Sequence, residues 1–233
     1  MTSSPSLPAA VLLDMDGTLV DTEPYWLATE HEVVERHGST WSHEQGLKLV
    51  GQDLRTAARI ILDETGLAGE PDDLVAELVA GVVERMRREG TPWRPGAQAL
   101  LARLAEAGVP CALVTMSYAE VTTAVVEGSP AGTFATVVSG DQVTHGKPHP
   151  EPYLTAASRL GVDVRRCVAI EDSPVGASSA LAAGARTIAV PLMVDVAARP
   201  GLSRLRSLEH LDLDLLGRIL DGEDVDEVVA TRA

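Results

Sequence analysis

Hydrophobic and polar positions change their pattern near residue 92. A short apolar run at 11–13 predicts a buried strand, and from residue 22 to about residue 91 the pattern is helical, with no strand signal. After residue 93, strand patterns and helix patterns alternate. This alternation is typical of a parallel sheet with right-handed crossovers. The chain therefore predicts the α/β class, with a doubly wound parallel sheet and an inserted all-helical segment.

Capping residues and glycines set the expected boundaries. In the helical segment they predict helices at 22–37, from residue 42, at 53–65 and at 71–89. Beyond it they predict strands at 111–115, 135–139, 167–170 and 187–190, and helices at 97–107, 117–126, up to 160, at 174–183 and around 211–220. Thr22 and Ser117 are expected as N-caps, and 187–190 is the last clear strand. We predict an α/β core of residues 1–21 and 92–233 and a helical cap of residues 22–91.

Composition narrows the class of protein. Hydrophobic residues make up 45% of the chain and charged residues 23%, which is typical of a globular protein and argues against disorder. The formal net charge of −15 argues against a nucleic-acid partner. No targeting segment and no run of about 20 apolar residues is visible, and the two cysteines do not form a disulfide framework. We therefore expect a cytoplasmic protein with no membrane partner. The oligomeric state is not readable from the sequence.

Two carboxylates end the first predicted strand. Asp14 and Asp16 follow the apolar run, Gly17 permits an immediate turn, and Thr18 adds a hydroxyl. Taken alone, these residues fit an Asx turn after a strand as well as an active site. Burying a carboxylate is costly unless a cation lies beside it. The residues at the ends of the other strands therefore decide between a turn and an active site.

The other strand ends carry matching chemistry. Ligands bind at the carboxyl ends of the strands in parallel sheets, and four polar clusters are expected at that edge. The three clusters after the first strand hold Thr115 and Ser117, then Lys147, then Glu171 and Asp172. Several carboxylates with few nitrogen or sulfur ligands point to Mg²⁺. His145 and His149 flank Lys147, but their spacing spans a Gly-Pro loop, which argues against a metal-binding pair.

A carboxylate-bound Mg²⁺ beside a lysine and a hydroxyl is suited to phosphoryl transfer. The metal and Lys147 would reduce the repulsion between a carboxylate and a phosphate ester. One aspartate can then act as nucleophile and form an aspartyl-phosphate. The other can protonate the leaving oxygen and later deprotonate water.

These motifs together resemble the haloacid dehalogenase (HAD) superfamily. The resemblance rests on the segments 14–24, 115, 146–152 and 170–177, in that order, and covers nearly the whole chain. It is similar to the branch with a helical cap after the first motif, which includes β-phosphoglucomutase-like proteins and sugar-phosphate phosphatases. It implies a Rossmann-like core and a Mg²⁺-dependent phosphatase acting on a small phosphorylated metabolite, such as a sugar or polyol phosphate, through an aspartyl-phosphate.

The resemblance also implies roles for individual residues. Asp14 would be the nucleophile, Asp16 the general acid and base, Thr115 a phosphoryl-binding residue and Lys147 the charge stabiliser. The metal ligands would be Asp14, the Asp16 backbone carbonyl and Asp172, with Glu171 nearby or direct. Substrate-binding positions would be Gly51, Arg55 and Ser117. An N-cap at Asp53 and a surface arginine explain the 51–55 segment equally well.

Several departures separate the alternatives. Members that act as dehalogenases lack the second aspartate, and phosphonatases need a lysine on the first cap helix, where 22–37 has none. Mutases of the β-phosphoglucomutase type carry a histidine where this chain has Trp26 and a lysine where it has Tyr118. These differences favour a hydrolase, although Trp26 could also be a packing residue between cap and core. A phospho-accepting regulatory protein is a further alternative, but such receivers lack a helical lid.

Overall fold

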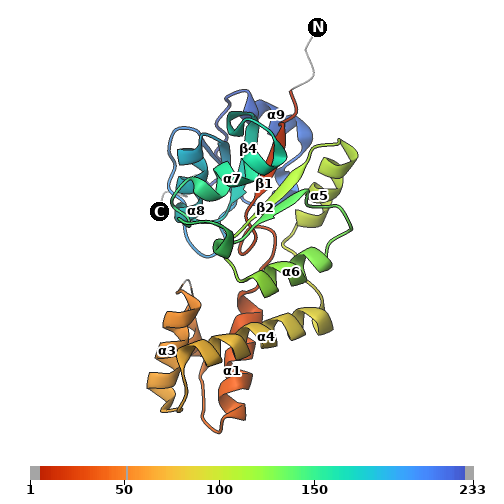
Figure 1. Cartoon of the computed structure of the whole chain (residues 1–233). Coiled ribbons are helices and arrows are strands. Elements are labelled where there is room, and N and C mark those ends of the chain that lie inside the picture. The colour runs from red at the N-terminus through yellow and green to blue at the C-terminus, as the bar shows by residue number, and fades with distance from the viewer. Residues whose placement is uncertain (1–5, 51, 229–233) are drawn as a thin grey trace.

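One parallel sheet forms the centre of the protein (Figure 1). The computed structural model describes residues 6–50 and 52–228. Within these residues the sheet order is β3-β2-β1-β4-β5-β6, and every neighbouring pair is parallel. The strands are β1 (Ala10–Leu13), β2 (Cys111–Val114), β3 (Thr136–Val138), β4 (Cys167–Glu171), β5 (Arg186–Ala189) and β6 (Leu202–Arg204). This strand order is that of the doubly wound dinucleotide-binding folds, so the predicted fold class is confirmed.

Helices follow the strands and also form a separate group. In chain order they are α1 (Glu23–Arg36), α2 (His43–Leu47), α3 (Leu54–Thr65), α4 (Pro71–Glu89), α5 (Ala97–Glu106), α6 (Ala119–Glu127), α7 (Glu151–Leu160), α8 (Pro174–Ala183) and α9 (Leu213–Leu220). Short 3₁₀ turns lie at η1 (Gly140–Gln142), η2 (Val164–Arg166) and η3 (Leu208–His210).

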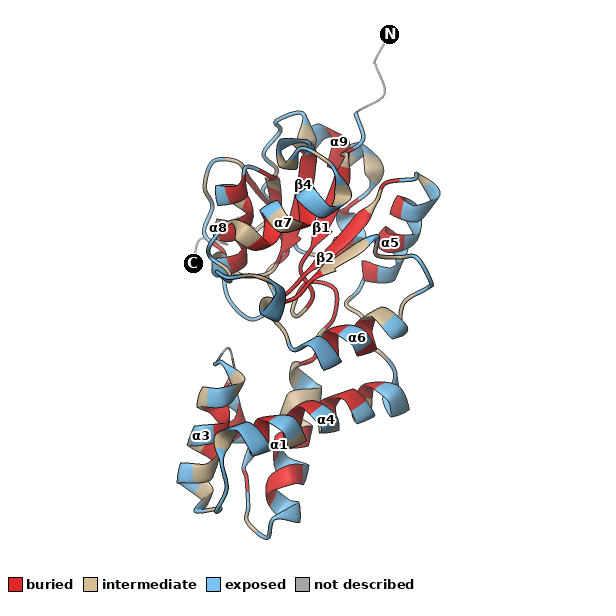
Figure 2. Ribbon diagram, in the orientation of Figure 1, coloured by how far each residue is buried: buried red, intermediate tan, exposed pale blue. Residues whose placement is uncertain are grey.

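The strands at the centre of the sheet are buried (Figure 2), and alternate residues of β1 lie on opposite faces of the sheet. Val11 and Leu13 belong to a cluster with α5 and α9, whereas Leu12 belongs to a second cluster with α7 and α8. The four residues of β1 are all fully buried. A strand covered on both faces needs a continuous apolar run, which is the pattern that predicted it.

The helical segment leaves the sheet and returns to it at one place. Val20 forms an antiparallel bridge with Trp93, the Asp21 N–H donates to the Pro92 carbonyl (2.9 Å), and the Arg94 N–H donates to the Leu19 carbonyl (2.8 Å). Between these linkers, α1 to α4 form the helical group below the sheet in Figure 1. This is the geometry of an insertion. The boundaries 22–91 stay a prediction.

The predicted element boundaries hold in most places and fail in two. Asp53, Ser42 and Ser173 cap their helices as expected. Thr22 is the N-cap residue of α1 as predicted, although its side chain makes no capping bond. The capping box at Ser117 is wrong, since α6 begins at Ala119 after Tyr118. The strand β6 was not expected, because Leu-Ser-Arg carries no apolar run.

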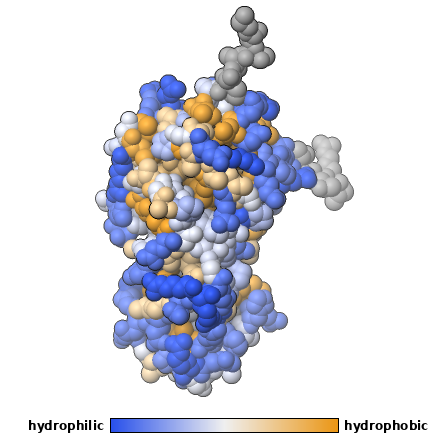
Figure 3. Space-filling view, turned by 90° about the vertical axis from the view of Figure 1, so that its right-hand side faces the viewer, coloured by the Kyte–Doolittle hydropathy of each residue, from blue (hydrophilic) through white to orange (hydrophobic). Residues whose placement is uncertain are grey.

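The surface is mainly polar over the helical group. On the face in Figure 3, hydrophilic residues cover most of the lower, helical part, and hydrophobic residues gather over the sheet part. Among the described residues, no helix combines the length and apolar character that crossing a bilayer would require. The cellular compartment stays a prediction.

Replacing Ile61 by alanine tests whether the helical group has a tightly packed core of its own. Ile61 lies on α3 and is fully buried, so Ile61→Ala should lower the free energy of unfolding by about 2–5 kcal/mol. The exposed Asp63 on the same helix is the control, and Asp63→Ala should change it by less than about 0.5 kcal/mol. Chemical denaturation measures both, and equal effects would contradict close packing at Ile61.

Candidate active site

The polar strand ends converge on one edge of the sheet, as predicted. Asp14 follows β1, the central strand between β2 and β4, and its N–H donates to the Ile170 carbonyl of β4 (3.0 Å). Thr115 follows β2, and Glu171 is the last residue of β4. The loop after β1 lies on the side that faces the helical group (Figure 1).

A buried lysine joins three of these strand ends. The Lys147 ammonium donates to Asp14 Oδ1 (2.6 Å), to Glu171 Oε1 (2.7 Å) and to the carbonyl of Val114 (2.9 Å). Its side chain is only 6% exposed. Burial alone would lower the pKa of Lys147, but the carboxylates of Asp14 and Glu171 outweigh burial and raise it. The lysine is therefore a permanent cation with three fixed partners.

One ammonium does not balance the carboxylates around it. Burial and the charge of Asp14 raise the pKa of Glu171, and burial with the charges of Asp14 and Glu171 raises the pKa of Asp172 to about 8. Oxygen atoms of Asp14, Glu171 and Asp172 lie within 4.8 Å of one another. Oxygen donors at this spacing, with excess negative charge, suit a hard divalent cation.

The hydroxyl of Thr18 fixes the remaining oxygen of Asp14. It donates to Asp14 Oδ2 (2.8 Å), while Lys147 holds Oδ1. Glu171 is held on both sides as well. The buried Tyr153 hydroxyl donates to its Oε1 (2.5 Å), and the Ser173 hydroxyl contacts its Oε2 (3.3 Å). Sequence reasoning missed Tyr153, because a tyrosine on an amphipathic helix reads as packing.

Asp16 occupies a different environment from Asp14. The Thr22 hydroxyl donates to Asp16 Oδ1 (2.6 Å), and the side chains of Thr22 and nearby Ser117 both favour its ionised form and so lower its pKa. Removal from water outweighs both effects and, with the charge of Asp14, raises the pKa of Asp16 to about 6. Asp16 therefore exchanges a proton near neutral pH. Its side chain is outside the three-carboxylate cluster.

A glycine and an arginine side chain hold the turn after β1. Gly17 has φ +78°, and a Cβ built there would lie 2.0 Å from Asp172 Oδ2, so a larger residue is excluded. The Arg94 guanidinium donates to the Gly17 carbonyl and to the Val190 carbonyl (2.8 Å). Arg94 thus ties this turn to the end of β5. No local sequence signal marks it, since its partners are 77 and 96 residues away.

The predicted substrate-binding residues lie in different places. Ser117 lies beside Asp16, and its N–H donates to Thr115 Oγ1 (3.0 Å). Arg55 pairs with Asp72 (2.9 Å) on the exposed surface of the helical group, and it makes no ion pair with the strand-end carboxylates. Gly51 lies outside the described residues.

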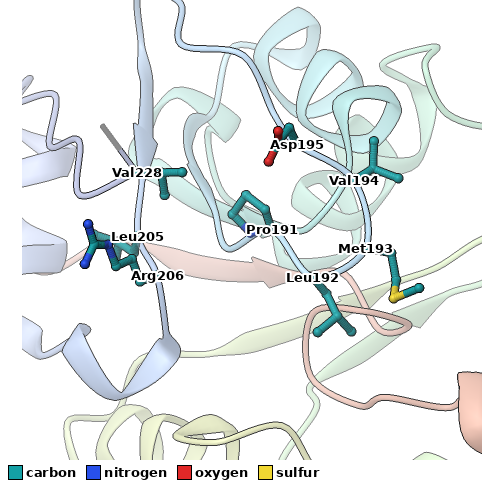
Figure 4. A pocket seen from close by; sticks show the side chains of 8 residues that line it. All are labelled: Pro191, Leu192, Met193, Val194, Asp195, Leu205, Arg206 and Val228. Carbon is teal, nitrogen blue, oxygen red and sulfur yellow. The ribbon is translucent and has the colours of Figure 1, made fainter. Parts of the chain in front are cut away.

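Several hollows in the described part of the chain lie outside the carboxylate cluster. One of about 390 Å³ is bordered by the loop 191–195, Leu205, Arg206 and Val228 (Figure 4), and none of these is a predicted site residue. A larger groove of about 1010 Å³ runs between α4 and α6, with Asp72 and Tyr118 on its walls. This groove lies between the helical group and the α/β core.

The comparisons with known proteins agree with this geometry. Residues 11–190 match the family model described as haloacid dehalogenase-like hydrolase. Hexitol phosphatase A of Escherichia coli (strain K12) is 36% identical over 215 residues, which cover 86% of this chain and 91% of that protein. Hexitol phosphatase B of the same strain is 30% identical over 191 residues, covering 81% and 86%. The chain belongs to the haloacid dehalogenase-like hydrolase family.

A solved structure matches in fold as well. Mutant CbbY of Rhodobacter sphaeroides, in complex with xylulose-1,5-bisphosphate, superposes with a TM-score of 0.75 at 27% identity. The match covers 88% of this chain and 96% of that one. The predictions of the family, of the Rossmann-like fold with a helical cap and of a hydrolase are confirmed.

Replacing Asp16 by asparagine should remove the part of the free energy of unfolding that falls as pH rises. Because folding raises its pKa from 3.8 to about 6, Asp16 favours folding below pH 4, and this contribution is lost as pH rises through 6. Asp16→Asn should therefore become more stable relative to wild type by about 2 kcal/mol between pH 4 and pH 7.5. Denaturation in chelator measures this difference, and a constant difference would contradict the raised pKa.

Replacing Gly176 by alanine should destabilise the protein, although alanine normally stabilises a helix. A Cβ at Gly176 would lie 2.0 Å from atoms of the buried Glu171 carboxylate. The cost of such overpacking is about 1–3 kcal/mol, which exceeds the gain of about 1 kcal/mol from helix propensity. The exposed Val175 provides the control, since Val175→Ala on the same turn should be nearly neutral. A stabilised Gly176→Ala would show that Glu171 moves freely.

Proposed function

We propose that this protein is a Mg²⁺-dependent phosphatase that hydrolyses a small phosphomonoester through an aspartyl-phosphate. The observation that carries the proposal is the pair of unlike aspartates after β1. Asp14 is held as a carboxylate acceptor by Lys147 and Thr18, whereas Asp16 has a pKa of about 6. A nucleophile and a proton carrier two residues apart are the two groups that such a reaction needs.

The substrate class follows from the relatives. The family match and the phosphatase names of several relatives support a phosphoric monoester hydrolase. Hexitol phosphatase A and a glycerol-3-phosphatase of Arabidopsis thaliana carry the names of polyol phosphates. A sugar or polyol phosphate is therefore the proposed substrate. The helical cap, for which we propose residues 22–91, would restrict the site to small molecules.

In the first step, Asp14 attacks phosphorus. An Oδ–P bond forms and the P–O bond to the alcohol breaks, while Asp16 protonates the leaving oxygen. Thr22 and Ser117 keep the Asp16 side chain in place for this transfer. Lys147 offsets negative charge beside Asp14, and Thr115 and the turn amides are proposed donors to the phosphoryl oxygens.

In the second step, Asp16 acts as a base. It takes a proton from water, which attacks phosphorus and releases phosphate, restoring the Asp14 carboxylate. Asp16 then carries the proton for the next cycle. A group with a pKa near 6 can both give and take this proton at neutral pH.

The donor set fits Mg²⁺. Asp14 and Asp172 are its proposed side-chain ligands, with the Asp16 carbonyl, and Glu171 is near enough to join them. Bound there, the ion would neutralise carboxylate charge and polarise the phosphoryl group. In the described arrangement Glu171 Oε1 already accepts from Lys147 and Tyr153, so we propose that Glu171 chiefly holds Lys147.

Phosphate release from a panel of sugar and polyol phosphates tests the proposed function. Wild type should hydrolyse at least one of them in Mg²⁺ and lose this activity in chelator. Asp14→Asn removes the nucleophile and should lower kcat by about 10³-fold or more. The distant Asp63→Ala is the matched control, and it should keep wild-type activity.

Analysis of the products and of the phosphorylated enzyme with the same substrates distinguishes the alternatives. Isomer formation that needs a bisphosphate activator would support a mutase of the β-phosphoglucomutase type. A long-lived aspartyl-phosphate without turnover would support a regulatory protein. No activity with any ester, or full activity in Asp14→Asn, would refute the proposal.

A further inference from the structure

A second group of side chains that could bind a metal lies on the loop before α7 and at the first residue of that helix. His145, His149 and Glu151 each offer one ligand atom, and these atoms lie within 4.8 Å of one another. The two imidazole rings have centroids 4.6 Å apart. The sequence spacing had argued against a metal-binding pair, but the loop folds so that both rings approach one carboxylate.

The distances are close to those of a three-ligand zinc site. His145 Nδ1 lies 2.9 Å and His149 Nδ1 lies 3.9 Å from Glu151 Oε2. Ligands at 2.0–2.2 Å from a tetrahedral ion are about 3.3–3.6 Å from one another. The two separations from Glu151 lie on either side of this range, and the ligand atoms of the two imidazoles lie within 4.8 Å of each other, so shifts of about 1 Å in the side chains would close the site.

The carboxylate is already oriented for this role. Glu151 Oε1 accepts from the Thr144 N–H (2.7 Å), and Oε2 accepts from the His145 N–H (3.0 Å). These hydrogen bonds lower the pKa of Glu151, so it is an anion. Hydrogen bonds of this kind orient ligands in metal sites. His149 Nδ1 accepts from the Glu151 N–H (3.2 Å), and it has to give up this hydrogen bond to bind an ion through the same lone pair.

The rest of the coordination sphere is open to solvent. The His145 side chain is 61% exposed and the His149 side chain is 50% exposed. Three protein ligands with an open fourth position is the arrangement that leaves room for water on zinc. Imidazole ligands favour zinc, nickel or copper, whereas the strand-end carboxylates favour magnesium. The two sites therefore differ in the ions they prefer.

We propose that His145, His149 and Glu151 form a second metal site, which binds Zn²⁺ or a similar transition-metal ion with water as a further ligand. The ion replaces the proton that His145 Nδ1 shares with Glu151. The site is separate from the carboxylate cluster, although the loop that carries its two histidines also supplies Lys147. This inference does not depend on the proposed phosphatase activity.

A matched pair elsewhere provides the control. His210 Nδ1 lies 2.7 Å from Glu227 Oε2, which is the same kind of ion pair with a single imidazole. If an exposed histidine beside a glutamate were enough to bind zinc, this pair would bind it as well. The proposal therefore requires that the second imidazole, His149, makes the difference.

Calorimetric titration with Zn²⁺ in excess Mg²⁺ tests the site. Wild type should bind one Zn²⁺ ion, and His149→Ala or His145→Ala should weaken binding by about 10-fold or more. His210→Ala should bind as wild type does. Asp172→Asn, which alters the carboxylate cluster, should also keep this Zn²⁺ ion. Circular dichroism checks that each variant is folded.

Two results would overturn the proposal. One is the absence of Zn²⁺ binding to folded wild type. The other is binding that persists in both His145→Ala and His149→Ala but disappears in Asp172→Asn, which would assign the ion to the carboxylates. The visible spectrum of bound Co²⁺ gives a second readout, since imidazole coordination in wild type should alter it and the His149→Ala variant should not show the change.

Discussion

The ion pair network of Lys147 is the interaction on which the site depends. Its ammonium meets Asp14 after β1, Glu171 at the end of β4 and the Val114 carbonyl at the end of β2. An isolated carboxylate in this position would pay a large desolvation cost, and removing the lysine would leave two of them unpaired. The network is therefore a structural joint between three strands as well as part of the chemistry. Its excess negative charge is what makes a bound cation favourable.

Much of the fold was predictable because its signals are local. An apolar run at β1, glycine stops such as Gly66 and caps such as Asp53 each specify an element from a few neighbouring residues. The strand β6 escaped prediction because its three residues are identified only by pairing with β5. The start of α6 was misplaced because Ser117 is engaged with the site and does not cap the helix.

The candidate site also contains residues that could be predicted from local sequence and residues that could not. Asp14, Asp16, Lys147 and Asp172 were predictable because strand ends in a parallel sheet share one edge. The role of Thr22 was not predicted because a threonine before a helix is typical of an N-cap, although its partner Asp16 is only six residues away. Arg94 was missed because its partners are distant in sequence, and Tyr153 because a tyrosine on an amphipathic helix is typical of packing. Arg55 is a residue for which the sequence suggested a role that the structure does not support. It lies on the helical group as expected, but it pairs with Asp72 on the exposed surface.

The joint between the two linkers connects the helical group to Asp16, the proposed proton carrier. The Gly17 N–H donates to the Val20 carbonyl (2.8 Å), Val20 bridges to Trp93, and Thr22 at the start of α1 holds Asp16. A tilt of the cap about this joint would stretch or shorten the Thr22–Asp16 bond. Because that bond favours the ionised carboxylate, opening and closing of the cap would alter the proton affinity of Asp16. In the proposed mechanism, movement of the cap and proton transfer by Asp16 would then be coupled.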